Sequence, residues 1–173
     1  MDASHIKPFV ASIQNVFSTM LQLQVTIKEP HLKTPQGPTS DVSGIIGMSG
    51  DVLGSVVLSF PTATAENVVA LFCGQRLTSG TPDFADAIGE LVNMVTGGAK
   101  AMFKDRRISI SCPTVVLGPS HVLARQSDVP TVVIPCATDC GDLNIEISIK
   151  DAKASTATDS ASAKNPAAQR VIA

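Results

Sequence analysis

The sequence has few aromatic residues: tryptophan and tyrosine are absent, and aromatics, all of them phenylalanine, make up 3% of the chain. Proteins that stack nucleic-acid bases or enclose cations in aromatic cages depend on such side chains. Charge is also nearly balanced, with 13 basic against 15 acidic residues and a formal net charge of −2. Without a strong overall field, we expect neither nucleic acid nor a membrane surface as the partner.

Long apolar runs are missing as well. No stretch approaches the length of a membrane-spanning helix, and the first 24 residues lack the basic start, apolar run and small-residue cleavage site of a secretory signal. We therefore expect a cytoplasmic protein.

Recognisable catalytic and metal-binding motifs are also lacking. The chain has no phosphate-binding glycine loop, no Gly-x-Ser-x-Gly elbow and no His-Glu-x-x-His helix. With three histidines and no Cys-x-x-Cys pair, a metal site is not expected. We expect no cofactor held by this chain, and reduced, mostly buried thiols at Cys73, Cys112, Cys136 and Cys140.

The length and the 44% hydrophobic content are enough for one sizeable core. Residues 1–151 are predicted to form a single domain. Residues 152–173 are rich in Ala, Ser, Thr and Lys without apolar periodicity, which predicts a disordered tail.

Apolar spacing predicts helices over residues 4–21, after Pro61 as far as Gly74, and over residues 83–105. Extended segments are predicted at 42–48 and 53–60, joined as a hairpin around Gly50 and Asp51, and at 108–117, 121–126, 131–136 and 143–150. The last segment alternates apolar and polar residues, as in a sheet with one wet face. The predicted class is α/β of the α+β type, with a mixed, largely antiparallel sheet and helices packed on one face.

The helix over residues 83–105 carries the most information. At about 100° per residue, one side is apolar, with Phe84, Ile88, Leu91, Val92, Val95, Ala99, Met102 and Phe103. The opposite side carries Asp86, Glu90, Asn93 and Gly97, and Lys100 and Lys104 extend this polar stripe. A polar stripe is also what any surface helix shows, and Asp86 in the first turn favours the helix dipole whether or not a partner binds.

Gly97 and Gly98 each lower helix stability by roughly 0.5–1 kcal/mol relative to alanine, although the apolar period continues past them. Three explanations remain open at this level. A partner's backbone could approach closely, the helix could break or end there, or Gly98 could pack tightly inside the protein.

The segment from Gly89 to Lys100, Gly-Glu-Leu-Val-Asn-Met-Val-Thr-Gly-Gly-Ala-Lys, resembles the active helix of the CheC, CheX and FliY chemotaxis phosphatases. The pattern of Asp or Ser, then Glu, then Asn, then Gly falls on Asp86, Glu90, Asn93 and Gly97. Residues 6–9, 16–20 and 113–118 are also similar to CheX, so the resemblance covers most of residues 4–150. One Glu-x-x-Asn helix, rather than two, is similar to CheX rather than to CheC.

The resemblance implies hydrolysis of the aspartyl phosphate of a CheY-like response regulator, whose receiver domain supplies its own Mg²⁺. It implies that Asn93 orients the attacking water and that Glu90 pairs with the receiver's lysine, with Asp86 and Gly97 contacting the substrate protein. It also implies a homodimer formed through the sheets, for which the alternating strand at 143–150 is a candidate edge.

Three other functions are considered. A non-catalytic adaptor could bind a receiver through the same stripe, and a scaffold domain could leave the stripe solvated and interact through its tail. A small-molecule hydrolase would need a nucleophile, and Ser109 and Ser111 have no suitably spaced His and acid to activate them.

Overall fold

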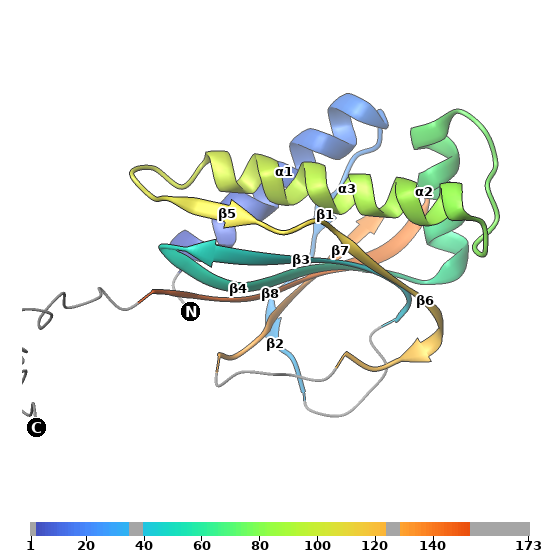
Figure 1. Cartoon of the computed structure of the whole chain (residues 1–173). Coiled ribbons are helices and arrows are strands. Elements are labelled where there is room, and N and C mark those ends of the chain that lie inside the picture. Colours follow the sequence, from blue (N-terminus) through green and yellow to red (C-terminus); the bar gives the residue numbers. More distant parts are fainter. Residues whose placement is uncertain (1–2, 35–39, 124–128, 153–173) are drawn as a thin grey trace, which may run out of the picture.

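The computed structural model describes residues 3–34, 40–123 and 129–152, and within them places three helices on one face of an eight-stranded sheet (Figure 1). The α+β class predicted from the sequence is confirmed, and all the described ladders are antiparallel. In chain order the elements are α1 (Ala3–Met20), β1 (Thr26–Ile27), β2 (His31–Leu32), β3 (Ser40–Gly50), β4 (Val52–Phe60), α2 (Thr62–Cys73), α3 (Pro82–Ala101), β5 (Ile108–Ile110), β6 (Thr114–His121), β7 (Val132–Thr138) and β8 (Gly141–Asp151).

The strands lie in the order β1-β7-β8-β4-β3-β5, with β2 also pairing with β7 and β6 also pairing with β3. β8 therefore lies between β7 and β4, and the expectation that it forms a free edge is wrong. Its alternating pattern marks a strand with two different faces, which an interior strand can have as well as an edge strand. The outer positions belong to β1 and β2 on one side and to β5 and β6 on the other.

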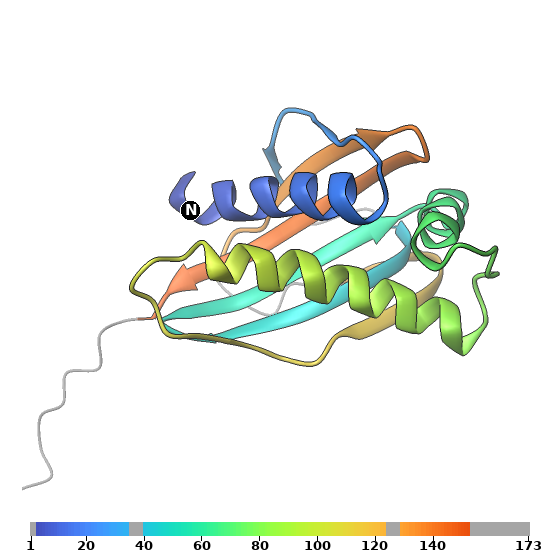
Figure 2. The ribbon, with the colours of Figure 1, turned by 90° about the horizontal axis from the view of Figure 1, so that it is seen from above.

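The core lies between the sheet and the helices. Figure 2 shows α1 and α3 side by side above the sheet, with α2 at one end. The apolar residues of α3 face the strands, and the fully buried side chains include Phe9, Phe17, Phe60, Phe84, Ile88 and Leu91. No helix in the described ranges is long and apolar enough to cross a membrane.

The predicted hairpin and the end of the second helix are confirmed. β3 and β4 pair from Val42↔Phe60 to Met48↔Gly54 and are joined at Gly50 and Asp51. α2 ends at Gly74, whose φ of 68° is the left-handed conformation that glycine adopts without steric cost.

The face of the sheet opposite the helices is less exposed than its alternating pattern predicts. Ser43 and Ser59 are buried, and Glu146 is only 5% exposed. Lys33, which follows β2, places its Nζ 2.6 Å from Glu146 Oε2. The alternation of apolar and polar residues identifies the polar side of β8. The burial of Glu146, however, depends on Lys33 after β2, more than a hundred residues earlier in the chain.

The end of α3 and the strand after it also differ from expectation. α3 ends at Ala101 and not near residue 105, and Met102, predicted to be buried, is 43% exposed. The single strand predicted over 108–117 is divided into β5 and β6 by residues 111–113, and β6 then continues through Gly118 and Pro119 to His121. Residues 153–173 lie outside the described residues, so the disordered tail stays a prediction.

Candidate functional site

The α3 helix has clear physical reasons to begin where it does. Thr81 is its N-cap, with Oγ1 accepting a hydrogen bond from the backbone N–H of Phe84 at 3.4 Å. Pro82 occupies the first helical position, where its missing N–H costs nothing, and Asp83 places negative charge at the positive end of the helix dipole. A capped helix with a buried apolar face thus fixes the orientation of the polar stripe, which we call the α3 stripe and which consists of Asp86, Glu90, Asn93 and Gly97.

The polar residues of the stripe lie on the side of α3 that faces away from the sheet. Asp86 and Glu90 are exposed, and Asn93 is half-buried. Their side chains make no hydrogen bond or ion pair with the described residues. Asn93 lies three positions after Glu90, so their Cα atoms are about 4.5 Å apart along the helix axis. A carboxylate and a neutral amide are therefore available together to one partner.

The two adjacent glycines have different roles. A Cβ atom at Gly97 would meet no atom within 4 Å, whereas one at Gly98 would lie 2.4 Å from Ser12 Oγ in α1. Ser12 is buried, and its Oγ donates a hydrogen bond of 2.7 Å to the carbonyl oxygen of Val95. Gly98 therefore lets α1 pack against α3, and nothing within the described protein requires glycine at position 97. The helix neither breaks nor ends at the pair.

This packing predicts that Gly98→Ala lowers the free energy of unfolding by about 1–2 kcal/mol. The new methyl group displaces Ser12 Oγ and breaks a buried hydrogen bond, which outweighs the gain in helix propensity. Urea denaturation of the wild type, Gly98→Ala, Ser12→Ala and the double variant measures the effect. In the Ser12→Ala background, Gly98→Ala should be neutral or stabilising; an equal loss in both backgrounds would contradict the account.

A third glycine connects α3 to the neighbouring strands. A Cβ at Gly89 would lie 3.3 Å from Pro113 Cγ, so Pro113 lies against the helix one residue before Glu90. Ser111 is held by the backbone: its Oγ accepts from Gly47 N at 3.0 Å and donates to Cys112 O at 2.7 Å. Ser111 thus stabilises the turn between β5 and β6 and is not placed as a nucleophile.

Ser43 and His121 form a Ser–His pair that could suggest a catalytic site. Ser43 Oγ lies 2.8 Å from His121 Nε2, but Ser43 is completely buried and His121 Nδ1 donates to the carbonyl oxygen of Gly118. A catalytic serine must be accessible, and its histidine is normally oriented by an acid. The small-molecule hydrolase hypothesis gains no support from this pair. No group of three or more His, Cys, Asp and Glu in the described ranges is placed to hold a metal ion.

The described cysteines are free thiols. Contrary to expectation, Cys73 and Cys112 are exposed; Cys136 is buried and Cys140 is intermediate. Burial raises the pKa of the Cys136 thiol to about 12, which keeps it protonated and unreactive at neutral pH.

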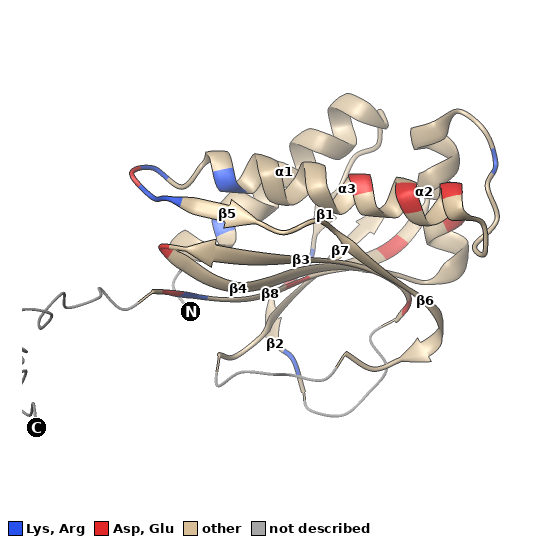
Figure 3. Cartoon of the chain, in the orientation of Figure 1, with Lys and Arg blue, Asp and Glu red and all other residues tan. Residues whose placement is uncertain are grey.

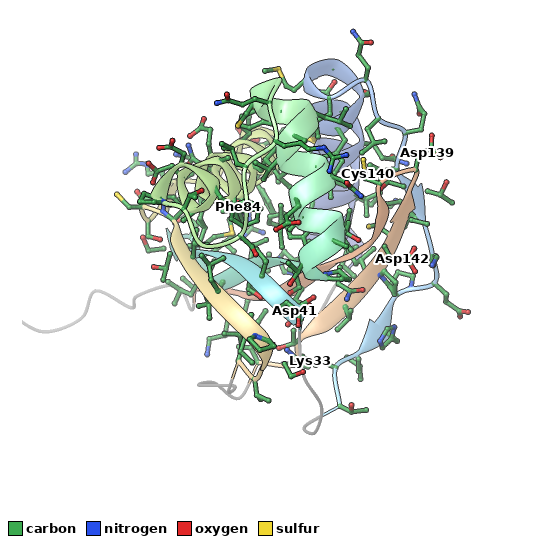
Figure 4. All side chains as sticks on the ribbon, turned by 90° about the vertical axis from the view of Figure 1, so that its right-hand side faces the viewer. Lys33, Asp41, Phe84, Asp139, Cys140 and Asp142 are labelled. Atoms are coloured by element: carbon green, nitrogen blue, oxygen red, sulfur yellow. The ribbon has the colours of Figure 1, made fainter. Side chains whose placement is uncertain are left out.

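Asp41 has a structural role at the start of α2 that could not be predicted from the sequence. It lies beneath the first turn of α2 (Figure 4) and accepts from the backbone N–H of Thr62 at 3.1 Å and of Ser120 at 3.2 Å. These two hydrogen bonds hold the pKa of its carboxyl below the ordinary value. Pro61, the N-cap of α2, provides no side-chain cap, so Asp41 takes that role from β3. Asp41 also lines a surface pocket with Val42, Thr62, Ser79, Leu117, Gly118 and Pro119.

The turn after α3 is fixed by two acidic residues, one at the end of β8 and one between β3 and β4. Asp151 Oδ1, in the last residue of β8, accepts from Arg106 Nη1 at 2.5 Å and lies 3.0 Å from Nε2 of the buried His5. Asp51 Oδ2 accepts from the backbone N–H of Arg107 at 2.7 Å. Hydrogen bonds from His5 and Arg106 lower the pKa of the Asp151 carboxyl.

Since this pKa lies below its ordinary value of 3.8, the ionised form of Asp151 stabilises the fold above about pH 4, and that contribution is lost as the pH falls further. Asp151→Asn should therefore lower the urea midpoint at neutral pH, and the difference from wild type should shrink at lower pH. Urea midpoints between about pH 2 and pH 7 measure this. A difference that stays constant over the range would show that the charge of Asp151 is not involved.

A comparison with known protein families adds a further observation. A family model described as "Chemotaxis phosphatase CheX" matches residues 42–137, which is more than half of the chain. The chain belongs to the CheX family.

Individual relatives agree with the family assignment. The "CheY-P phosphatase CheX" of Thermotoga maritima is 29% identical over 125 residues, covering 68% of this chain and 78% of that protein. The crystal structure of the chemotaxis protein CheX from Desulfovibrio desulfuricans is 30% identical, covers 84% of this chain and 99% of its own, and superposes with a TM-score of 0.78. A CheX–CheY–BeF₃–Mg²⁺ complex from Borrelia burgdorferi contains a chain of the same fold, with a TM-score of 0.72, 21% identity and coverage of 85% and 98%.

The family match includes the whole of α3 and therefore all four residues of the α3 stripe. In this chain Asp86, Glu90, Asn93 and Gly97 lie on the outer side of α3. This position makes them candidates for contact with a partner. The contacts of Ser12 and Asp41 join residues far apart in sequence, and no local sequence signal could have identified them.

Proposed function

We propose that this protein hydrolyses the aspartyl phosphate of a CheY-like response regulator. The observation that carries the proposal is the pair of exposed Glu90 and half-buried Asn93. Their side chains have no partners in the described protein, and the open position at Gly97 follows one turn later. The proposal is supported by membership of the CheX family and by the Thermotoga maritima relative, which is named a CheY-P phosphatase. The Borrelia burgdorferi complex gives an example of this fold together with CheY.

Asn93 positions the water. An aspartyl phosphate is a mixed anhydride, so in-line attack by water on phosphorus breaks its P–O bond, releases inorganic phosphate and regenerates the aspartate carboxylate. The amide of Asn93 is neutral, so it can hydrogen-bond the attacking water without repelling the phosphoryl oxygens. Because the water is already held in line, part of the entropic cost of attack is offset by binding energy before the chemical step.

Glu90 orients the partner. A carboxylate close to the phosphoryl group would repel it, but one turn of helix before the amide it can form a charge-assisted hydrogen bond to the receiver's lysine. Gly97 lets the partner approach α3 closely, and Asp86 adds an outer contact. In this account Mg²⁺ belongs to the receiver, and the phosphatase contributes only its own side chains.

The proposal is tested by following the loss of radiolabelled phosphate from purified CheY-like receivers, with and without this protein. Catalytic amounts should accelerate the loss over several turnovers. Stoichiometric binding without acceleration would instead favour the adaptor function. Because the substrate is an intracellular signalling protein, we also infer that the protein acts in the cytoplasm.

We further propose that the protein is a homodimer. Since β8 lies inside the sheet, pairing between two copies would have to use the outer strands, β1 and β2 on one side or β5 and β6 on the other. Sedimentation velocity at micromolar concentration is expected to give a dimer, and a monomer throughout that range would contradict the proposal.

A further inference from the structure

The charges along α3 are segregated by sign. Figure 3 shows acidic residues on the half of α3 nearest α2, and mainly basic residues at its other end and in the turn that follows. The acidic half carries Asp83, Asp86 and Glu90. The basic end carries Lys100, Lys104, Arg106 and Arg107, with Asp105 as its one acidic residue. Asp86 and Glu90 are four residues apart, a spacing at which like charges destabilise an isolated helix. The helix dipole favours Asp83 in the first turn and Lys100 in the last, so part of the segregation is intrinsic to the helix. The dipole does not account for Lys104, Arg106 and Arg107, which lie beyond the end of α3 at Ala101.

The basic end is fixed in place, and most of its charge is unpaired. Arg106 is bound by Asp151, and the backbone of Arg107 by Asp51. In contrast, the side chains of Lys100 and Lys104 make no ion pair with any residue in the described ranges. The turn therefore presents cations on a rigid support, next to the open helix surface at Gly97.

On the basis of the proposed phosphatase function, we propose that this basic end, centred on Lys100 and Lys104, is a second docking element that binds an acidic patch on the phosphorylated receiver. The helical rise places Lys100 about 10 Å along the axis from Asn93 and about 15 Å from Glu90. The receiver therefore presents acidic groups about 10 Å from its phosphoryl group, on the side opposite the lysine that meets Glu90. Because the two ends of α3 have opposite charge, the receiver can dock in one direction only.

Exposed charges of this kind act mainly on the rate and direction of association. Replacing both lysines by glutamate should raise the KM for phosphorylated receiver about tenfold at low ionic strength and leave kcat unchanged at saturation. Between about 0.03 and 0.3 M salt the difference should shrink, since screening weakens the repulsion. The KM of the neutral variant Lys100→Gln/Lys104→Gln should lie between those of wild type and the double-glutamate variant.

The matched control is Lys7→Glu/Lys150→Glu, which makes the same change in net charge at exposed positions on α1 and β8. Its KM should stay within twofold of wild type, and thermal melting should show all variants folded. Equal KM values for the two double-glutamate variants, or a drop in kcat alone, would overturn the proposal.

Binding separates this proposal from the proposed function. Fluorescence anisotropy with a receiver treated with beryllofluoride, which mimics the phosphoryl group, measures affinity without turnover. If wild type binds but does not hydrolyse, the phosphatase function fails, whereas a tenfold weaker binding of Lys100→Glu/Lys104→Glu would still support the docking element. If wild type hydrolyses and the variant binds equally well, only the docking element fails.

Discussion

Asn93→Ala is expected to slow dephosphorylation of the receiver by about 100-fold or more while the protein remains folded. Losing a group that orients the attacking water costs roughly 10²–10³ in rate in comparable preorganised sites. The fold should not suffer, because the Asn93 side chain makes no hydrogen bond with the described residues. Single-turnover decay of labelled phospho-receiver measures the rate, and circular dichroism measures folding.

Two further variants make this prediction specific. Asn93→Asp keeps the shape but places a negative charge next to the phosphoryl group, so it should be at least as inactive as alanine. Asn15→Ala removes an exposed asparagine from α1 and should have no effect. Unfolding of Asn93→Ala, or retention of more than about a tenth of the wild-type rate, would remove Asn93 from the proposed role.

Gly97→Val is expected to lower activity by at least about tenfold, equivalent to roughly 1.4 kcal/mol, without lowering stability. A Cβ atom here would meet no atom of the described protein within 4 Å, and valine has a slightly higher helix propensity than glycine. Its methyl groups would instead stand between α3 and the receiver, so the loss should appear as weaker binding. The activity of Gly97→Ala should lie between those of wild type and Gly97→Val.

The control is Gly80→Val, at a glycine in the loop before α3 where an added Cβ also meets nothing within 4 Å. It should leave KM and kcat unchanged. If Gly97→Val keeps full activity, the open position at Gly97 is not in the interface. If it unfolds the protein, position 97 is constrained from within, contrary to the structure.

The parts of the fold set by local patterns could be predicted from the sequence. The apolar face of α3 is set by its 3.6-residue period, and the hairpin around Gly50 and the end of α2 at Gly74 follow from turn and capping preferences. Because Glu90 and Asn93 lie opposite the apolar face, their outward orientation follows from the same period.

Other features depend on contacts between distant residues. The sequence left three explanations for Gly98 open, and only the position of Ser12 in α1 selects tight packing. Likewise, an alternating strand can lie inside a sheet or at its edge, and the pairing of β8 with both β7 and β4 decides this. The exposure of Met102 results from the end of α3 at Ala101, before the apolar period is completed.

The most direct test of the central claim compares binding and turnover for the same three proteins: wild type, Glu90→Ala and Asn93→Ala. Wild type should accelerate loss of phosphate from a CheY-like receiver. Asn93→Ala should bind the beryllofluoride-treated receiver normally but not accelerate the loss, and Glu90→Ala should be impaired in both. Equal turnover by wild type and Asn93→Ala would contradict the central claim, as would tight binding by wild type with no acceleration for any receiver.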